Sequence, residues 1–240
     1  LTDVTGVQTC ALPIFVEHII DKTIAYEMTD DPGFKKNVLL IGTFFWDDTD
    51  NAVLMEAKVD QPGMEDWTLT RMYEVPQSSY SCDYNVSYAN VQSVWTSNTF
   101  AFVNWAGHGS PTACYELYPS QPFVDTALCP QLDDNYPAII FADACSNSET
   151  SEISIGARMM EQGGVGFVGS TRVAYGCPGW SGPSDGSSQS LDYFFSSGVM
   201  SGGMSQGEAM QNGLSQVYQM NGWDYTELEM CEWTLYGNPD

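Results

Sequence analysis

Four stretches of the chain are continuously apolar over the length of a strand. They are rich in β-branched and aromatic residues and are bounded by turn residues, a pattern typical of strands buried on both faces of a parallel sheet. The four stretches are Val38–Phe45, Phe100–Gly109, Pro137–Cys145 and Gly164–Ser170. A fifth predicted strand, Thr68–Tyr73, alternates between apolar and polar residues, and a short sixth, Trp233–Tyr236, lies near the C-terminus.

The segments between these runs favour helices and turns. In Phe15–Glu27, the apolar residues Ile19, Ile20 and Ile24 fall near one face of a helix. Strands that alternate with helices, without a repeat or a linker, predict one α/β domain with a mostly parallel sheet flanked by helices. Further helices are predicted over Val86–Thr96, Ser154–Gln162, Gln189–Phe195 and Gly207–Met220, a turn over Asp30–Gly33, and long loops over Ser110–Gln131 and Gly176–Ser188.

Two of the predicted strands end on reactive side chains. Phe100–Gly109 ends on His108, which lies between two glycines, and Pro137–Cys145 ends on Cys145. In open α/β sheets, ligands bind outside the carboxyl ends of the strands, so neighbouring strands would place both side chains at one crevice. A Cys beside a His is the minimum needed for catalysis by a thiolate nucleophile.

The motifs around these two residues resemble those of one enzyme family. NWAGHGS at 104–110 and FADAC at 141–145 are similar to motifs of the gingipain-type cysteine peptidases of the caspase-like clan. Other segments keep the family's order, so the resemblance covers roughly Phe15–Asp240. It implies a caspase-like three-layer sandwich and a cysteine endopeptidase that hydrolyses protein or peptide substrates. A catalytically inactive caspase-like module for binding or surface display is the alternative.

The resemblance also implies roles for individual residues. Cys145 would attack the peptide carbonyl to form a thioester, and His108 would protonate the departing amine. The backbone N–H groups of Gly109 and Cys145 are the expected oxyanion donors. The polar run Ser146–Ser151 is predicted to form a strand-to-helix turn whose amides favour the Cys145 thiolate. Asp143 is expected to be a hydrogen-bonding residue at the strand end, with a catalytic part as the less favoured alternative.

A third catalytic group is not evident in the sequence. Family members that have one place a carboxylate just after the strand equivalent to Val38–Thr43, where this chain has Phe44 or Phe45. Asp47 and Asp48 follow only slightly later. The expectation is therefore a Cys–His dyad.

Residues that select the substrate are predicted from the same family pattern. In relatives that cut at arginine or lysine, an acidic residue binds the basic side chain, and counting along this chain leads to Glu56, with Asp48 and Asp50 as weaker candidates. Tyr175 and Trp180 fall where relatives place an aromatic wall over the pocket. Packing in the core or in a loop explains both aromatic residues equally well.

The charge of the chain limits its partners. The formal net charge is −24, from 31 acidic and 7 basic residues, while charged residues make up only 16% of the chain. Typical globular proteins contain about 25% charged residues, so the imbalance reflects a scarcity of Lys and Arg. The scarcity of Lys and Arg therefore disfavours nucleic acids and anionic membrane surfaces as partners, because both are bound through basic side chains. No apolar run approaches the roughly 20 residues of a spanning helix, so no membrane-spanning segment is expected.

The sequence gives little indication of a metal site. Zinc is not expected, since there is no C-x-x-C motif and only two His are present. Asp47–Asn51 (DDTDN) offers oxygen ligands suited to calcium but lacks the glycine of an EF-hand, so a solvated acidic loop is the favoured interpretation. No cofactor is required, although the family resemblance allows a structural calcium ion. Cys114 and Cys129 could form a disulfide in an oxidising compartment.

The N-terminal segment looks foreign to the domain. Val4–Ile14 (VTGVQTCALPI) resembles the translation of a sequencing-adapter oligonucleotide. Residues 1–14 are therefore expected to be non-native, and residues 15–240 to be a gingipain-like peptidase domain truncated at its N-terminal side. The family resemblance implies a secreted or cell-surface protein. His18, on the first helix, is expected to have a surface or capping role.

Overall fold

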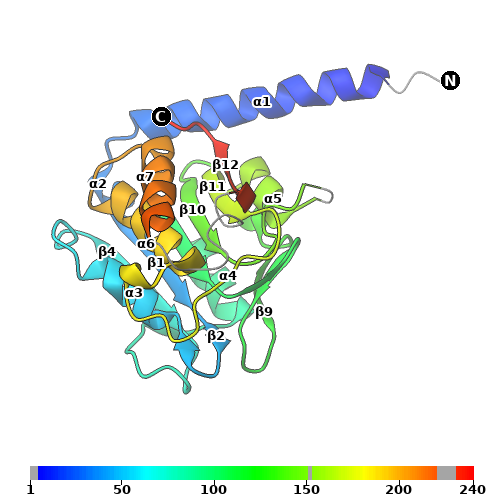
Figure 1. The fold of residues 1–240 in the computed structure, drawn as a ribbon. Coiled ribbons are helices and arrows are strands. Elements are labelled where there is room, and N and C mark those ends of the chain that lie inside the picture. Colours follow the sequence, from blue (N-terminus) through cyan, green and yellow to red (C-terminus); the bar gives the residue numbers. More distant parts are fainter. Residues whose placement is uncertain (1–4, 151–152, 221–230) are drawn as a thin grey trace.

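A seven-stranded sheet, whose central strands are buried along their whole length, organises the fold (Figure 1). The computed structural model describes residues 5–150, 153–220 and 231–240, with side chains from residue 16 onward. The strand order is β12-β11-β10-β6-β1-β4-β5, and all pairs are parallel except that of β11 with β12. The strands are β1 Asn37–Gly42, β4 Thr68–Tyr73, β5 Tyr84–Asn85, β6 Phe102–Ala106, β10 Ala138–Asp143, β11 Gly164–Ser170 and β12 Trp233–Gly237.

Alternate residues of the central strands face two helical layers. In β1, Leu39 and Ile41 belong to one apolar cluster, and Val38 and Leu40 to the other. Helices α4 and α5 cover the first face, and α3, α6 and α7 cover the second. This arrangement confirms the predicted three-layer α/β fold. The helices are α1 Thr5–Met28, α2 Pro32–Lys35, α3 Ala52–Val59, α4 Tyr88–Ser97, α5 Ile155–Glu161, α6 Ser187–Met200 and α7 Gln206–Gln219.

Helix α1 crosses one end of the sheet and passes close to the C-terminus (Figure 1). The Asn238 side chain donates a hydrogen bond to Glu27 at 3.0 Å, which joins the last turn of α1 to the C-terminal segment. His18 lies on the exposed side of this helix, and its Nε2 is 2.9 Å from Asp134 Oδ2. The position of His18 agrees with the surface role expected for it.

The first core strand is shorter than the sequence predicts. It ends at Gly42, and Phe44–Trp46 (β2) pairs instead with Thr49–Asp50 (β3) in a hairpin. At the end of β1, Gly42 packs on the start of α3, where a Cβ would lie 2.8 Å from the Ala52 nitrogen. Helix α3 itself was not predicted.

The predicted loop Ser110–Gln131 contains regular structure. His108–Ser110 (β7), Ala113–Tyr115 (β8) and Pro122–Asp125 (β9) form a small antiparallel sheet, and Cys129–Gln131 is a 3₁₀ turn. The loop prediction was wrong because the strands are only three or four residues long, too short for an alternating pattern to be visible. The small sheet positions His108 at the end of the large one.

A buried ion pair joins two helices on the second face. Lys58 of α3 and Asp192 of α6 are both fully buried, with Lys58 Nζ 2.8 Å from Asp192 Oδ2. Lys58 also donates to the side-chain oxygen of Asn104 on β6, whose Nδ2 donates to the Phe141 carbonyl at 2.9 Å. Burial lowers the pKa of Lys58 and raises that of Asp192, and the opposite charge of the partner counteracts each shift. We refer to Lys58, Asp192 and Asn104 as the buried polar cluster.

Replacing Lys58 with methionine should lower the free energy of unfolding by about 3–5 kcal/mol, because it leaves the Asp192 carboxylate buried without its counter-charge. Lys36→Met is the matched control, since Lys36 pairs with Asp66 at 3.4 Å on the surface, where an ion pair contributes about 0–1 kcal/mol. Urea unfolding at neutral pH measures both variants. Equal losses in the two variants would contradict the role assigned to the buried pair.

Candidate active site

The sheet brings the two sequence motifs together at the carboxyl ends of adjacent strands. β6 lies between β1 and β10, and Ala106 at its end is opposite both Gly42 and Asp143. Just beyond the strand, the Gly107 N–H donates to the Asp143 carbonyl at 3.1 Å. The segments that follow β6 and β10 therefore leave the sheet side by side, as the sequence predicts for His108 and Cys145.

His108 and Cys145 line the same pocket. Its free volume is about 50 Å³, and its walls come from four segments of the chain: the β2 strand, the β6–β7 junction, the turn after β10 and the segment after β11. The structure thus brings an imidazole and a thiol to one small cavity beyond the carboxyl ends of the central strands. The lining residues are Phe45, Trp46, Gly107, His108, Ala144, Cys145, Ala174 and Gly176.

Gly109 fits between the His-bearing strand and the Cys-bearing turn because it has no side chain. A Cβ at Gly109 would lie 2.2 Å from the Cys145 carbonyl oxygen and 2.6 Å from the Cys145 nitrogen. Both distances are far inside van der Waals contact, so any other residue would push the two segments apart. The Gly109 backbone also lowers the pKa of the Cys145 thiol against the effect of burial. These contacts bring the two residues expected to supply the oxyanion donors side by side.

Asn147 holds the same two segments together with hydrogen bonds. Its side chain is fully buried, and its Nδ2 donates to the Ser110 carbonyl at 2.9 Å while its Oδ1 accepts from Trp105 Nε1 at 3.1 Å. Between Cys145 and Asn147, Ser146 has a φ of +57°, which turns the chain sharply after the cysteine. The sequence analysis missed Asn147, because a single polar residue in a polar run carries no periodic signal.

The imidazole of His108 is oriented by a backbone carbonyl. His108 Nε2 lies 2.7 Å from the carbonyl oxygen of Phe45, and the two rings are 6.0 Å apart between centroids. A carbonyl oxygen can only accept a hydrogen bond, so this contact requires a hydrogen on Nε2. In the neutral ring, Nδ1 then carries the free lone pair. The chain position at which relatives place a carboxylate thus contributes a main-chain oxygen.

The carboxylate of Glu74 holds the strand whose Phe45 carbonyl contacts His108. Glu74 follows β4, and its Oε2 accepts hydrogen bonds from the Phe44 N–H at 3.0 Å and from the Leu117 N–H at 3.2 Å. Its other oxygen accepts from the Tyr118 N–H. Burial raises the pKa of Glu74, and the bonds from Phe44 and Leu117 counteract the rise. Glu74 therefore fixes the strand that carries the Phe45 carbonyl, a role that the sequence analysis missed.

The environment of Cys145 differs from the predicted one. Residues 146–148 form a turn, and the next described helix, α5, begins at Ile155 after the cap residue Ser154. Among the described residues, no helix begins directly after Cys145 to lower the pKa of its thiol. Burial raises the pKa of Cys145 instead, while backbone hydrogen bonds with Ala174 and Gly109 counteract the rise. The sulfur lies 3.7 Å from the Ala174 carbonyl oxygen, which is compatible with a protonated thiol that donates to it.

Asp143 is buried beside the polar cluster, at the end of β10. Within the described part of the chain, neither of its carboxyl oxygens has a hydrogen-bond partner of good geometry. Burial and the nearby Asp192 charge raise the pKa of Asp143 to about 8, and the Ser188 side chain and the Lys58 charge counteract the rise. Asp143 thus favours its protonated form more than an exposed aspartate does.

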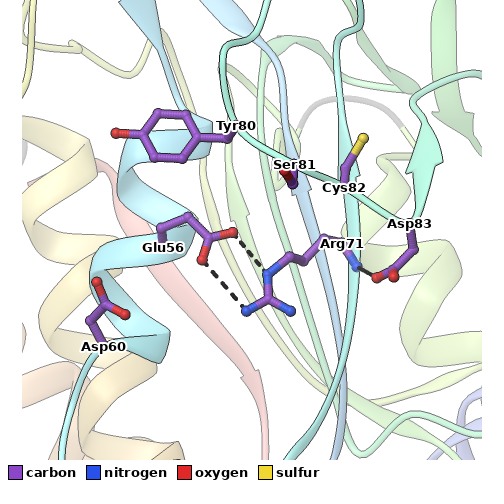
Figure 2. Close-up of a pocket in the computed structure, with 7 residues that line it drawn as sticks. All are labelled: Glu56, Asp60, Arg71, Tyr80, Ser81, Cys82 and Asp83. Carbon is purple, nitrogen blue, oxygen red and sulfur yellow. Dashed lines mark hydrogen bonds and ion pairs between the residues drawn. The ribbon is translucent and has the colours of Figure 1, made fainter.

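The predicted selectivity residues lie outside the Cys145 pocket. Glu56 on α3 lines a separate cavity of about 470 Å³, and Figure 2 shows its carboxylate turned toward Arg71. Glu56 Oε1 is 2.8 Å from Arg71 Nε and also accepts from the Tyr73 hydroxyl at 2.5 Å. Trp180 is buried and donates to Ser190 at 3.0 Å, so it is part of the core.

Tyr175 and the two weaker acidic candidates are also outside the lining of the pocket. Tyr175 is half-buried, and its neighbours in the sequence, Ala174 and Gly176, do line the pocket. The Tyr175 carbonyl oxygen accepts a hydrogen bond from the Ser188 N–H at 3.1 Å. Asp50 Oδ1 accepts from the Ala52 N–H at 3.0 Å and so caps helix α3. Asp48 is exposed and accepts a hydrogen bond from the Thr49 hydroxyl. The aromatic wall of the pocket comes from Phe45 and Trp46 instead.

The described residues contain neither a disulfide nor a cluster suited to a metal ion. Cys114 and Cys129 are both free and packed in the core, so the suggested bridge is not formed. No group of three or more His, Cys, Asp or Glu side chains in residues 16–150, 153–220 and 231–240 could hold a metal ion. A structural calcium ion and a secreted location stay predictions from the resemblance. No helix in the described ranges has both the length and the hydropathy needed to cross a bilayer.

A three-layer α/β fold with a thiol and an imidazole in one pocket at the sheet edge is typical of cysteine peptidases. Among protein-family models, the one described as peptidase family C25 matches residues 13–240, so the chain belongs to peptidase family C25, the gingipain family. Membership confirms the resemblance seen in the sequence and implies a cysteine-type peptidase with protein substrates. A comparison with curated proteins finds no match.

Replacing Gly109 with alanine should cost about 1–3 kcal/mol of stability, because the added methyl group overlaps the Cys145 backbone. Gly182→Ala is the control, since a Cβ at Gly182 meets no atom within 4 Å and its φ of 178° suits any residue. Thermal unfolding compares the two variants. If Gly109→Ala unfolds at the same temperature as the control, the close contact between these segments is not rigid.

Replacing Asp143 with asparagine should remove a pH dependence of stability. Between about pH 4, near the ordinary pKa of aspartate, and about pH 8, the folded protein holds a proton that the unfolded chain releases. The stability contribution of Asp143 therefore falls as the pH rises through this interval and is constant above it. Relative to wild type, Asp143→Asn should gain stability from pH 5 to pH 8, measured by urea unfolding. Asp47→Asn, at an exposed carboxylate, is the control, and a pH-independent difference for Asp143→Asn would contradict the assignment.

Proposed function

We propose that the protein is a cysteine endopeptidase in which Cys145 and His108 form a catalytic dyad. The observation that carries the proposal is the shared pocket, in which the imidazole of one motif and the thiol of the other lie at the ends of adjacent parallel strands. Membership in family C25 supports the same reaction class. The third element is the Phe45 carbonyl, which holds His108 in one tautomer.

In the resting state the Cys145 thiol is protonated, and His108 Nε2–H is bound to the Phe45 carbonyl. Because burial raises the pKa of Cys145, the thiolate is scarce until substrate is bound. As the sulfur attacks the peptide carbonyl, its proton passes to Nδ1 of His108, while Nε2–H remains bound to Phe45. The resulting imidazolium is stabilised by the Phe45 carbonyl and by the negative charge of Glu74, whose pKa reflects an electrostatic interaction with His108.

The remaining steps regenerate the enzyme. The tetrahedral oxyanion accepts hydrogen bonds from the Gly109 and Cys145 N–H groups, which typically contribute about 10²–10³ in rate each. The imidazolium of His108 gives its proton to the amine, the C–N bond breaks, and a thioester remains on Cys145. Water, deprotonated by His108, attacks the thioester and releases the carboxylic acid, and the thiol takes back the proton.

A second candidate is a caspase-like module that binds proteins without cleaving them. The raised pKa of Cys145 favours it, since a catalytic thiol is usually activated by a lowered pKa. In this alternative, Cys145 packs as an inert buried thiol. The two candidates differ in whether Cys145 forms a bond with an electrophilic peptide.

The test combines covalent labelling with substrate cleavage. A set of peptidyl chloromethyl ketones with different side chains should label Cys145, as mapped by mass spectrometry, and the labelling should require His108. Cys145→Ala should reduce the hydrolysis of fluorogenic peptides to background, and His108→Ala should reduce kcat by about 10²–10⁴. Cys82→Ala is the control, since Cys82 lines the separate cavity beside Glu56. An unlabelled Cys145 together with no hydrolysis would favour the non-catalytic module.

A further inference from the structure

The pocket beside the dyad has apolar walls. Apart from His108 and Cys145, its described lining is limited to two aromatic residues, two alanines and two glycines, with no carboxylate among them. The rings of Phe45 and Trp46 meet edge to face with centroids 5.9 Å apart. A Cβ at Gly176 would lie 2.9 Å from the Phe45 ring, so the opposite wall packs directly on these rings. Trp46 is 41% exposed and presents its surface to an incoming chain.

The described carboxylates around the pocket are not part of its lining. Glu232 is buried and its charge raises the pKa of Cys145, but it is not among the residues that line the pocket. Glu74 binds three backbone N–H groups behind the β2 strand, and Asp50 caps helix α3. Asp143 is fully buried next to Asp192 and Lys58, and its pKa is raised. Glu56, the sequence-based candidate for binding a basic side chain, faces Arg71 in a different cavity (Figure 2). A basic substrate side chain in the Cys145 pocket would therefore meet no carboxylate among the described residues that line it.

The size of the pocket gives a second constraint. Its volume of about 50 Å³ is far smaller than the roughly 470 Å³ of the cavity beside Glu56. The branched side chains of valine and leucine are shorter than those of arginine and lysine and therefore suit a small pocket better. A guanidinium or ammonium group placed against these apolar walls would lose part of its hydration, which is unfavourable.

We propose that this pocket receives the side chain of the residue that supplies the scissile carbonyl, and that it selects small aliphatic side chains over arginine and lysine. The proposal rests on the peptidase function proposed above and adds its substrate class. Cys145 attacks the carbonyl carbon of that residue, so the side chain next to this carbon is the one that the adjoining pocket can reach. Phe45 and Trp46 would form its aromatic wall.

The test uses the 240-residue chain and peptides that differ only in the residue before the cleaved bond. With alanine, valine, leucine, phenylalanine, lysine or arginine at this position, kcat/KM should be highest for valine or leucine. It should be at least about tenfold lower for lysine and arginine, the scale at which apolar pockets discriminate. A parallel series that varies the residue after the bond should show a weaker preference. A stronger preference there would overturn the assignment of the pocket to the carbonyl side.

Two variants test whether the Cys145 pocket or the cavity beside Glu56 determines the substrate preference. Trp46→Glu adds a carboxylate to the wall at a half-exposed position, so the ratio of the lysine to the leucine rate should rise at least about tenfold. Glu56→Gln changes the carboxylate of the separate cavity and should leave this ratio unchanged. A wild-type preference for arginine or lysine would overturn the inference while supporting the peptidase function, and its loss in Glu56→Gln or in Asp48→Asn would identify the carboxylate responsible. If no peptide is cleaved and no chloromethyl ketone labels Cys145, both proposals fail.

Discussion

The site depends on a contact between two backbones that leaves no space for a side chain. Gly109 lies against Cys145 so closely that a single methyl group would overlap the carbonyl and the nitrogen of the cysteine. Because both segments leave the sheet from paired strands, their relative position follows from the sheet register and from this contact together. Asn147 adds hydrogen bonds across the same junction, and the left-handed turn at Ser146 directs the chain away from it. The thiol and the imidazole are therefore positioned mainly by main-chain geometry.

The layer below the site is unusually polar for a protein core. Lys58, Asp192 and Asn104 form hydrogen bonds with one another at full burial, and Asp143 adds a carboxyl group next to them. Such a cluster is weak evidence for stability, because the desolvation of each charge offsets most of the attraction between them. What the cluster does provide is a directional link between α3, α6 and β6. Apolar contacts have no preferred direction, whereas the hydrogen bonds of Asn104 are satisfied only when α3, α6 and β10 lie as observed around β6.

The sequence predicts the strands that carry His108 and Cys145, but not the tertiary contacts of the charged residues or the short hairpins around them. The strands that end at His108 and Cys145 are continuous apolar runs, and their parallel pairing follows from the alternation of strands and helices. Glu56 shows the limit, since its partner Arg71 lies on another strand and only the tertiary structure brings the two together. Lys58 and Glu74 are similar cases, because a charged residue in a polar or mixed segment is normally exposed. The hairpins β2–β3 and β7–β8 were missed since strands of two or three residues leave no periodic pattern.

The acceptor that orients His108 belongs to the main chain, which has a consequence for how such sites evolve. Every amino acid carries the same carbonyl oxygen, so residue 45 could change its side chain freely while the orienting contact persists, provided the strand keeps its path. Natural selection would then act on the geometry of that strand, through residues such as Glu74 that hold it, and would leave residue 45 itself free to adapt the pocket wall. One position could thus serve orientation through its backbone and specificity through its side chain, and the two properties could diverge independently.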